Sequence, residues 1–241
     1  PINTRSRGAE AADVLERSGA VVLFTVSSFL GVDYAALLRA TEVALPALRE
    51  IVAIDTDWPD FTARGGGARH VADVAPDDIS HVQFTSGTTG RPKGAMLRHG
   101  AMCGTTRDWC RGVGLERGDR YLIVSPMFHV SGHKTGLLAC ITAGATAHPQ
   151  AVFDPVDVMR RVERERITVL PGPPTIYQTL LEHPQRGDFD LSSLRLAVTG
   201  AAAIPPVLVE RMRDELGFTR VVTAYGTTET TGVVTMCHAD D

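Results

Sequence analysis

Short apolar runs alternate with amphipathic stretches along most of this chain. Residues 9–18 have helical spacing and stop at Gly19, and the apolar, β-branched run 20–26 after them is typical of a buried strand. Asp33 is suited to cap a second helix, and residues 50–55 form a second strand-like run. The first part of the chain therefore predicts helices and strands in alternation.

The alternation breaks once and then resumes more regularly. Residues 55–78 contain three consecutive glycines and are expected to be irregular, and a strand at 79–84 follows them. Further strands are predicted at 121–125, 167–170, 194–199 and 220–225, and helices at 102–109, 133–143, 155–166, 175–182 and 207–216. Strands separated by helices predict a largely parallel sheet flanked by helices, which is the α/β class.

A cluster of glycines marks the expected boundary between two lobes of this kind. Gly112, Gly114 and Gly118 lie close together between two regular regions. We therefore expect a first α/β lobe over residues 1–118 and a second over residues 119–241.

Composition and charge narrow the class of partner. The 241 residues are 44% hydrophobic, enough for a sizeable core, and no apolar run approaches the roughly 18 residues of a membrane span. The net charge is −4 with basic residues scattered, so neither nucleic acid nor anionic lipid is an expected partner. The four cysteines form no CxxC pair and are expected to be packed, reduced thiols of a cytoplasmic protein. Small molecules remain as partners, and the oligomeric state is open.

The stretch FTSGTTGRPKG, residues 84–94, has the composition of a phosphate-binding loop. Gly87 and Gly90 allow backbone angles that let successive N–H groups converge on one anion, and Lys93 supplies positive charge. Four hydroxyl side chains accompany them: Thr85, Ser86, Thr88 and Thr89. The loop is neither a Walker A sequence nor GxGxxG, and the alternative is an ordinary surface turn rich in Ser, Thr and Gly.

The scarcity of lysine favours the phosphate interpretation. Of the 24 lysine and arginine residues, only Lys93 and Lys134 are lysines. A chain that uses arginine this consistently would place arginine at an indifferent basic position. Lysine at position 93 therefore suggests a need for a compact point charge that reaches phosphate oxygens.

Two predicted strands end in turns of unusual composition. The strand at 194–199 is followed by small residues against which a flat ligand can lie: Gly200, Ala201, Ala202 and Ala203. The strand at 220–225 runs into YGTTE, which consists of Tyr225, Gly226, Thr227, Thr228 and Glu229. This turn offers a ring face for a base, two hydroxyls and a carboxylate oxygen for a hard divalent cation. The alternative is a packed tyrosine followed by a capping threonine and glutamate. Because open α/β sheets bind ligands at the carboxyl ends of their strands, we expect both turns to face the phosphate loop.

The spacing of His129 and His133 resembles that of a metal-binding pair. They are four residues apart, but the glutamate of a zinc-binding helix is missing and nearby glycines make a helix at His129 doubtful. We do not expect a metal pair there.

Four motifs in order carry a resemblance. FTSGTTGRPKG, SPMFH at 125–129, TGAAA at 199–203 and YGTTE at 225–229 resemble those of the adenylate-forming acyl-CoA synthetase superfamily. The resemblance implies that ATP phosphates bind the loop, through Thr85, Ser86, Gly87, Thr88, Thr89, Gly90 and Lys93. It implies that Tyr225 stacks on adenine, that Thr228 meets the α-phosphate and the carboxylate, and that Glu229 binds Mg²⁺. The implied adenine-site neighbours are Gly200, Ala201, Ala202, Gly226 and Thr227, and His129 matches the histidine at the junction of acyl group and coenzyme A.

The implied reaction is activation of a small-molecule carboxylate by ATP and transfer of its acyl group to coenzyme A. Lys93, the loop N–H groups and Mg²⁺ on Glu229 would stabilise the leaving pyrophosphate, while Thr228 holds the α-phosphate. Within the family, residues 167–184 and 129–140 look most similar to members that act on propanoates of partly degraded steroid rings. Lys134 is expected to be a solvated lysine early in a helix, and a polar contact to the acyl tail or to coenzyme A is the alternative.

Family members are much longer than this chain. The start at Pro1 suggests an interior piece, and the family's ribose-binding aspartate, hinge and C-terminal lobe with its catalytic lysine are not in the sequence. We therefore expect this piece to bind nucleotide weakly and to be inactive alone. The competing interpretations are an amino-acid or aryl-acid adenylating domain, which shares the motifs, and a nucleotide-binding module without turnover.

Overall fold

The structure is a computed structural model that describes residues 1–65, 67, 72–85 and 92–238. It divides into two compact units, the first of Pro1–Ala75 with Phe84–Gly94 and the second of Pro76–Gln83 with Ala95–Asp241. This division differs from the boundary expected at residue 118. The reason is that helix α4 (His99–Val113) packs Trp109 into the same hydrophobic core as Tyr121 of the following strand, so both belong to one unit.

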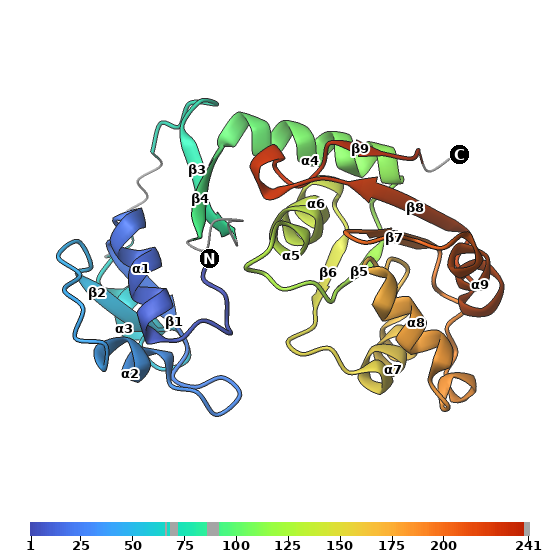
Figure 1. Cartoon of the computed structure of the whole chain (residues 1–241), viewed down its shortest axis with the longest axis horizontal. Helices are drawn as coiled ribbons and strands as arrows, with labels where there is room; N and C mark the ends of the chain where they lie inside the picture. Colours follow the sequence, from blue (N-terminus) through green and yellow to red (C-terminus); the bar gives the residue numbers. More distant parts are fainter. Residues whose placement is uncertain (66, 68–71, 86–91, 239–241) are drawn as a thin grey trace. The chain divides into compact units, whose positions relative to one another are not determined.

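The first unit is built on a short parallel strand pair covered by helices (Figure 1). Its elements are α1 (Gly8–Ser18), β1 (Val22–Thr25), α2 (Tyr34–Arg39), β2 (Glu50–Ala53) and α3 (Trp58–Ala63), and β1 pairs with β2 in parallel. Gly19 ends α1 in the left-handed conformation, and the Asp33 carboxylate caps α2 by accepting from Ala36 N, both as expected. Helix α3 lies in the segment expected to be irregular, with Pro59 in its first turn.

Strands β3 (Ile79–Thr85) and β4 (Lys93–Arg98) pair in a two-stranded sheet and flank residues 86–91. Strand β3 agrees with the prediction, whereas β4 was not predicted. Its sequence, KGAMLR, lacks the alternation of apolar and polar residues that identifies a strand.

The second unit contains the larger sheet. Its strands are β5 (Arg120–Ile123), β6 (Thr146–Pro149), β7 (Leu196–Gly200), β8 (Arg220–Tyr225) and β9 (Thr235–Met236). Strand β6 pairs in parallel with β5, β7 with β8 in parallel, and β8 with β9 in antiparallel register. Residues 167–170, expected to be a strand, contribute single parallel bridges from Val169 to Tyr121 and Leu196, which join the two halves. Pro171 follows directly and cannot donate to a ladder, so the pairing stays short.

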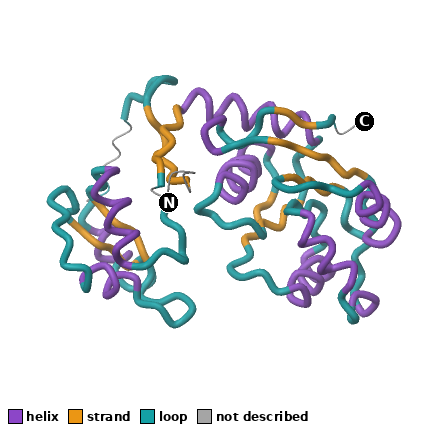
Figure 2. Tube along the Cα trace, in the orientation of Figure 1, coloured by secondary structure: helices purple, strands orange, loops and turns teal. Residues whose placement is uncertain are grey.

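Helices cover both faces of this sheet (Figure 1, Figure 2). One face packs against α7 (Pro155–Glu165), α8 (Pro174–Glu182) and α9 (Pro206–Leu216) through a core that includes Leu122 and Ala197. The other face packs against α4 and α6 (Ala139–Ala143) through Tyr121, Ile123 and Leu196. Neighbouring strand residues thus point to opposite layers, which confirms the predicted α/β class.

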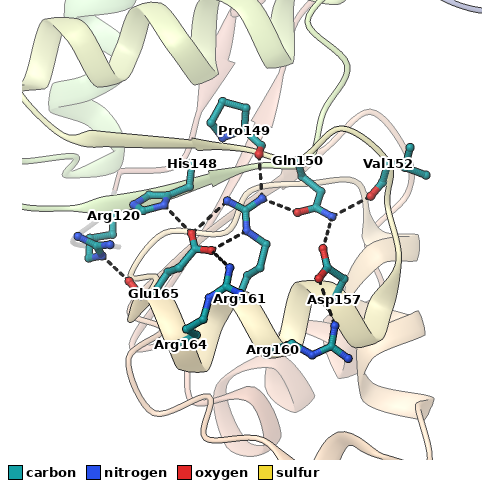
Figure 3. Close-up of polar contacts among 10 residues, drawn as sticks. All are labelled: Arg120, His148, Pro149, Gln150, Val152, Asp157, Arg160, Arg161, Arg164 and Glu165. Carbon is teal, nitrogen blue, oxygen red and sulfur yellow. Dashed lines mark hydrogen bonds and ion pairs between the residues drawn. The ribbon is translucent and has the colours of Figure 1, made fainter. Parts of the chain in front are cut away.

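The start of α7 matches its sequence signal, and its end is held by charges. Asp154 caps the helix by accepting from Asp157 N, and Pro155 occupies the first position. Near the other end, the Glu165 carboxylate accepts hydrogen bonds from both Arg161 Nε and Nη2 at 3.0 Å and contacts His148 Nδ1 at 2.7 Å (Figure 3). Since His148 lies on β6, this network fastens the helix to the sheet.

Among the described residues, no helix is long and apolar enough to cross a membrane.

Two of the four cysteines do not fit the expectation of packed thiols. Cys110 and Cys140 are buried, and burial raises the pKa of the first to about 11 and of the second to about 12. Cys103 and Cys237 are exposed, because they lie on the outward side of α4 and after the last short strand. All four are free thiols.

Candidate functional site

Three of the motif turns leave one edge of the sheet in the second unit. Strands β5, β7 and β8 run in the same direction, because Val169 bridges Tyr121 and Leu196 in parallel and β7 pairs with β8 in parallel. The turns after these strands carry His129, the alanines at 201–203 and YGTTE at 225–229. After β5, the next strand, β6, is added on one side of β5, and the following segment, at Val169, is added on its other side. The direction in which successive strands are added to the sheet therefore reverses beside β5. Open α/β sheets bind ligands outside such a reversal.

The turn after β7 requires small residues. Gly200 lies opposite Ala224 of β8, and a Cβ at Gly200 would lie 2.3 Å from the Ala224 carbonyl oxygen. Ala201 has a φ of 66°, in the left-handed region that few side chains tolerate, and Ala201 and Ala202 are exposed. Small, exposed residues thus form this turn, and their contact with a flat ligand stays a prediction.

The turn after β8 is held tightly by its own backbone and hydroxyls. A Cβ at Gly226 would lie 2.2 Å from the Gly232 carbonyl oxygen, so the two segments touch and only glycine fits. Thr227 N donates to Thr230 Oγ1 at 3.2 Å, and residues Thr228–Thr230 form a single 3₁₀ turn. The Tyr225 ring is 62% exposed. This exposure disagrees with the alternative of a packed tyrosine and leaves a ring face accessible.

The same turn presents an oxygen-rich surface. Thr228 is partly buried at the start of the 3₁₀ turn, and the Glu229 carboxylate next to it is exposed. A single carboxylate is what Mg²⁺ commonly takes from a protein when nucleotide phosphates complete its shell. Among the described residues, no group of three or more His, Cys, Asp or Glu side chains is arranged to hold a metal ion.

His129 is positioned by the backbone around it. It caps the short helix α5 (Val130–Gly132), and its Nδ1 accepts from Ser131 N at 3.1 Å. Gln83, almost fully buried on β3, donates from Nε2 to the Phe128 carbonyl oxygen at 2.6 Å and so fixes the preceding peptide. Partial burial lowers the pKa of the His129 imidazole, although the residue remains exposed. The lowered pKa favours the neutral form of the ring at pH 7. Sequence reasoning missed Gln83, whose role depends on a contact 45 residues away.

The phosphate loop is described only at its two ends. Ser86, Gly87, Thr88, Thr89 and Gly90 lie outside the described residues. Thr85 ends β3 and Lys93 begins β4, and Thr85 Oγ1 lies 3.5 Å from the Lys93 carbonyl oxygen. Lys93 itself is exposed.

Arg17 of helix α1 braces both ends of this loop. Its Nη1 donates to the Pro92 carbonyl oxygen at 2.7 Å, and its guanidinium carbon lies 5.0 Å from the centroid of the Phe84 ring. Nothing in the sequence around Arg17 pointed to this role, because the partners are far along the chain.

Lys134 contradicts the expectation of a solvated lysine. It is fully buried, and its Nζ has no hydrogen-bond partner among the described residues. Burial lowers the pKa of its ammonium group to about 8. The expectation failed because the predicted helix at 133–143 begins as a π-helix, His133–Leu138, whose residues Lys134, Thr135 and Gly136 are buried. His133 is also partly enclosed, its ring centroid 4.4 Å from that of His81.

Comparison with known proteins places this chain among the AMP-binding enzymes. The family model for AMP-binding enzymes matches residues 1–241. The 3-[(3aS,4S,7aS)-7a-methyl-1,5-dioxo-octahydro-1H-inden-4-yl]propanoyl:CoA ligase of Mycobacterium tuberculosis is 51% identical, over 100% of this chain and 49% of the relative. The ligase of the same name from Rhodococcus jostii is 47% identical, over 100% of this chain and 50% of the relative.

A solved structure agrees with the fold. The inhibitor-bound N-terminal domain of FACL13 from Mycobacterium tuberculosis superposes with a TM-score of 0.87 at 25% identity, over 100% of this chain and 59% of that one. The chain spans about half the length of the curated relatives it matches.

Proposed function

Because this chain belongs to the AMP-binding enzyme family, as its four motifs predicted, we propose that the protein activates a carboxylic acid with ATP and transfers it to coenzyme A. The observation that supports this best is the shared sheet edge of β5, β7 and β8, from which three motif turns emerge. In the first step a carboxylate oxygen attacks the α-phosphorus of ATP, and pyrophosphate leaves. In the second, the sulfur of coenzyme A attacks the acyl carbon, and AMP leaves.

The adenosine side of the site is proposed to lie between two turns. The exposed Tyr225 ring would stack on adenine, and the open backbone at Gly200, Ala201 and Ala202 would lie along it. Gly226 and Thr227 would keep the ring in place through the tight contact with Gly232.

The phosphate side is proposed to be held by charge and hydroxyl groups. Thr228 would orient the α-phosphate for attack in line with the leaving group, and Glu229 would hold Mg²⁺. When bound, Mg²⁺ would neutralise the charge that develops on pyrophosphate. Lys93 and the loop at residues 85–90 would bind the β- and γ-phosphates. Arg17 supports this role indirectly, because it fixes both ends of the loop.

His129 is proposed to stand where the acyl group meets the thiol. Its Nδ1 is engaged with Ser131, so a ligand would meet Nε2. A neutral ring can accept a proton there when the sulfur attacks.

The proposed substrate is a propanoate carried on a fused ring system. The two relatives near 50% identity are named for such an acid, a propanoyl group on a bicyclic diketone. The proposal also places the protein in the cytoplasm, which is consistent with four free cysteine thiols.

Lys93 provides the test. In the full-length protein, Lys93→Ala should lower ATP–pyrophosphate exchange at least tenfold, since a hydrogen bond to a charged group is worth about 1.5–3 kcal/mol. The matched control is Arg98→Ala at the other end of β4, where the side chain is exposed and pairs with Asp77 at 3.1 Å. If Lys93→Ala exchanges pyrophosphate as fast as this control, the loop is a surface turn and the proposal fails. If only amino acids or aryl acids support ATP–pyrophosphate exchange, the substrate belongs to one of those classes and is not a ring propanoate.

A further inference from the structure

Lys134 occupies an unusual backbone segment. It is the second residue of the π-helix His133–Leu138, between α5 and α6. π-Helical turns are rare, and they occur often at functional sites because they turn side chains away from the ordinary helical positions. In this chain the segment directly follows His129 and its short helix.

The side chain of Lys134 is buried without compensation. An ammonium group removed from water costs free energy unless a partner restores its hydrogen bonds. Lys134 forms no ion pair within the described residues, and its Nζ is one of their few buried polar atoms without a hydrogen bond. Only two of the 24 lysine and arginine residues in the chain are lysines, and one of them lies where its ammonium group is unsatisfied.

The neighbours of Lys134 come from the turns of the proposed site. A Cβ at Gly232 would lie 3.9 Å from Lys134 Cδ and 3.2 Å from Val130 Cβ. Gly232 in turn contacts Gly226, so it forms the base of the turn that carries Thr228 and Glu229. Val130 is the residue after His129. The lysine stem therefore lies beside Gly232, as does Val130, the residue after the proposed acyl-site His129.

The charged and titratable groups on the facing helix α4 do not supply a hydrogen-bond acceptor for the Lys134 ammonium group. On α4 the Cys110 thiol is the main electrostatic neighbour, and burial raises its pKa to about 11, so it is neutral. Asp108, the other influence from α4, has a side chain that is 66% exposed and lies 4.0 Å from Arg107. Within the part of the chain that the structure describes, no acceptor reaches Lys134 Nζ.

We propose that Lys134 determines substrate specificity by donating a hydrogen bond from its ammonium group to a keto oxygen on the ring system of the acyl group. The inference rests on the proposed function and names a residue for it. A ring carbonyl brings the acceptor that Lys134 lacks, whereas a purely hydrocarbon ring leaves the ammonium unpaired. Sites built to hydrogen-bond a substrate group reject analogues without it far more strongly than apolar pockets reject a missing methylene.

The test compares two acids in the full-length protein. One is the propanoate of the 7a-methyl-1,5-dioxo-octahydroindene, and the other is the same acid with methylene groups in place of both ketones. Thioester formation gives kcat/KM for each acid with wild type, Lys134→Met and Lys134→Gln. Arg107→Met, on the exposed side of α4, controls for loss of one positive charge.

We expect Lys134→Met to lower kcat/KM for the diketone by about 10- to 100-fold, the range of a hydrogen bond to a charged group. The value for the hydrocarbon acid should stay within about twofold, so the preference between the acids collapses. Lys134→Gln keeps an N–H donor and should recover part of the preference. The Met variant should melt at the same or a higher temperature, because an unpaired buried charge is replaced by an apolar side chain.

Several results would overturn the inference. Equal losses for both acids would give Lys134 a structural role, and a change confined to the KM for coenzyme A would assign it to that substrate. If the Met variant does not fold, the affinity of the wild type for each acid is compared by the shift in melting temperature that the acid causes. Equal affinity for the two acids refutes a donor that is specific for the keto group. Wild type that forms no thioester from any ring propanoate refutes the proposed function itself, whereas an active wild type with an unchanged variant refutes only the role of Lys134.

Discussion

Asp119 offers a direct test of how the sheet of the second unit is held together at the edge opposite the site. The residue is 4% exposed just before β5, and its carboxylate accepts hydrogen bonds from three neighbours. Arg195 Nε and Thr168 Oγ1 donate to Oδ1, each at 2.8 Å, while Glu116 N donates to Oδ2 at 3.0 Å and Arg195 Nη2 completes the set. Asp119 therefore joins the starts of β5, the Val169 segment and β7.

The change to make is Asp119→Asn, which keeps the shape and removes the charge. Burial alone would raise the pKa of Asp119, but the hydrogen bonds from Arg195, Glu116 and Thr168 outweigh it and lower the pKa. Removing one partner of a buried ion pair typically costs about 3–5 kcal/mol, because the other charge is left unpaired. Arg195 is 23% exposed and keeps a 2.9 Å bond to the Gly114 carbonyl oxygen. We therefore expect the lower end, about 3 kcal/mol.

Urea unfolding at pH 7 measures this loss, with the fluorescence of buried Trp109 as one probe of the same core. A double-mutant cycle with Arg195→Met should give a coupling energy of about 1–3 kcal/mol. The advantage of wild type should be complete above the ordinary carboxyl pKa and should shrink as the pH falls through the lowered pKa of the native state. Turnover per folded molecule should not change, because the pair lies at the other edge of the sheet.

Asp108→Asn is the matched control, since its side chain is 66% exposed on α4 and should alter stability by less than about 0.5 kcal/mol. If Asp119→Asn is no more destabilising than this control, or if the cycle gives no coupling, the pair does not hold the strand starts together.

Two further predictions concern α7 and the turn after β8. Hydrogen bonds, chiefly from Arg161, lower the pKa of Glu165 to about 2, so Glu165→Gln should reduce the free energy of unfolding by about 1–2 kcal/mol at pH 7. In acid unfolding followed by circular dichroism, this difference should vanish as the pH falls from about 4.5 to 2; a constant difference would contradict the charge-based reason. Gly226→Ala places a Cβ 2.2 Å from the Gly232 carbonyl oxygen and should lower ATP–pyrophosphate exchange at least tenfold, whereas Gly187→Ala, with nothing within 4 Å, should have no effect. Equal exchange rates in these two variants would show that the turn tolerates displacement.

Local signals determined most of the second unit. Asp154 and Pro155 start α7, while Gly144 and Gly217 end α6 and α9 in left-handed conformations. Such caps act within one turn of chain, so a reader of the sequence can locate them. The strands that became β5, β7 and β8 and the helices α7, α8 and α9 between them were predicted from such local patterns and confirmed, and the motifs that follow β7 and β8 indicated the family correctly.

Contacts between distant segments decided the rest. Residues 95–118 belong to the second unit because α4 packs on its sheet, and Gln83 is tied to the same unit by its hydrogen bond to Phe128, which no glycine spacing could indicate. Strands β4, β6 and β9 are short and weakly patterned, so they exist through pairing with neighbours. The roles of the site residues remain predictions.

Lys134 separates the two kinds of information most clearly. The sequence determined that a rare lysine follows His129 near the start of a helix, and on composition a solvated side chain was the natural expectation. Its burial depends in part on Gly232, nearly a hundred residues later, which lies beside the lysine stem. Local sequence determines where helices and strands start and stop because caps and periodicity act over a few residues. The burial of a charged group, and with it the pKa of that group, depends on contacts from several distant segments, and only the folded chain brings these segments together.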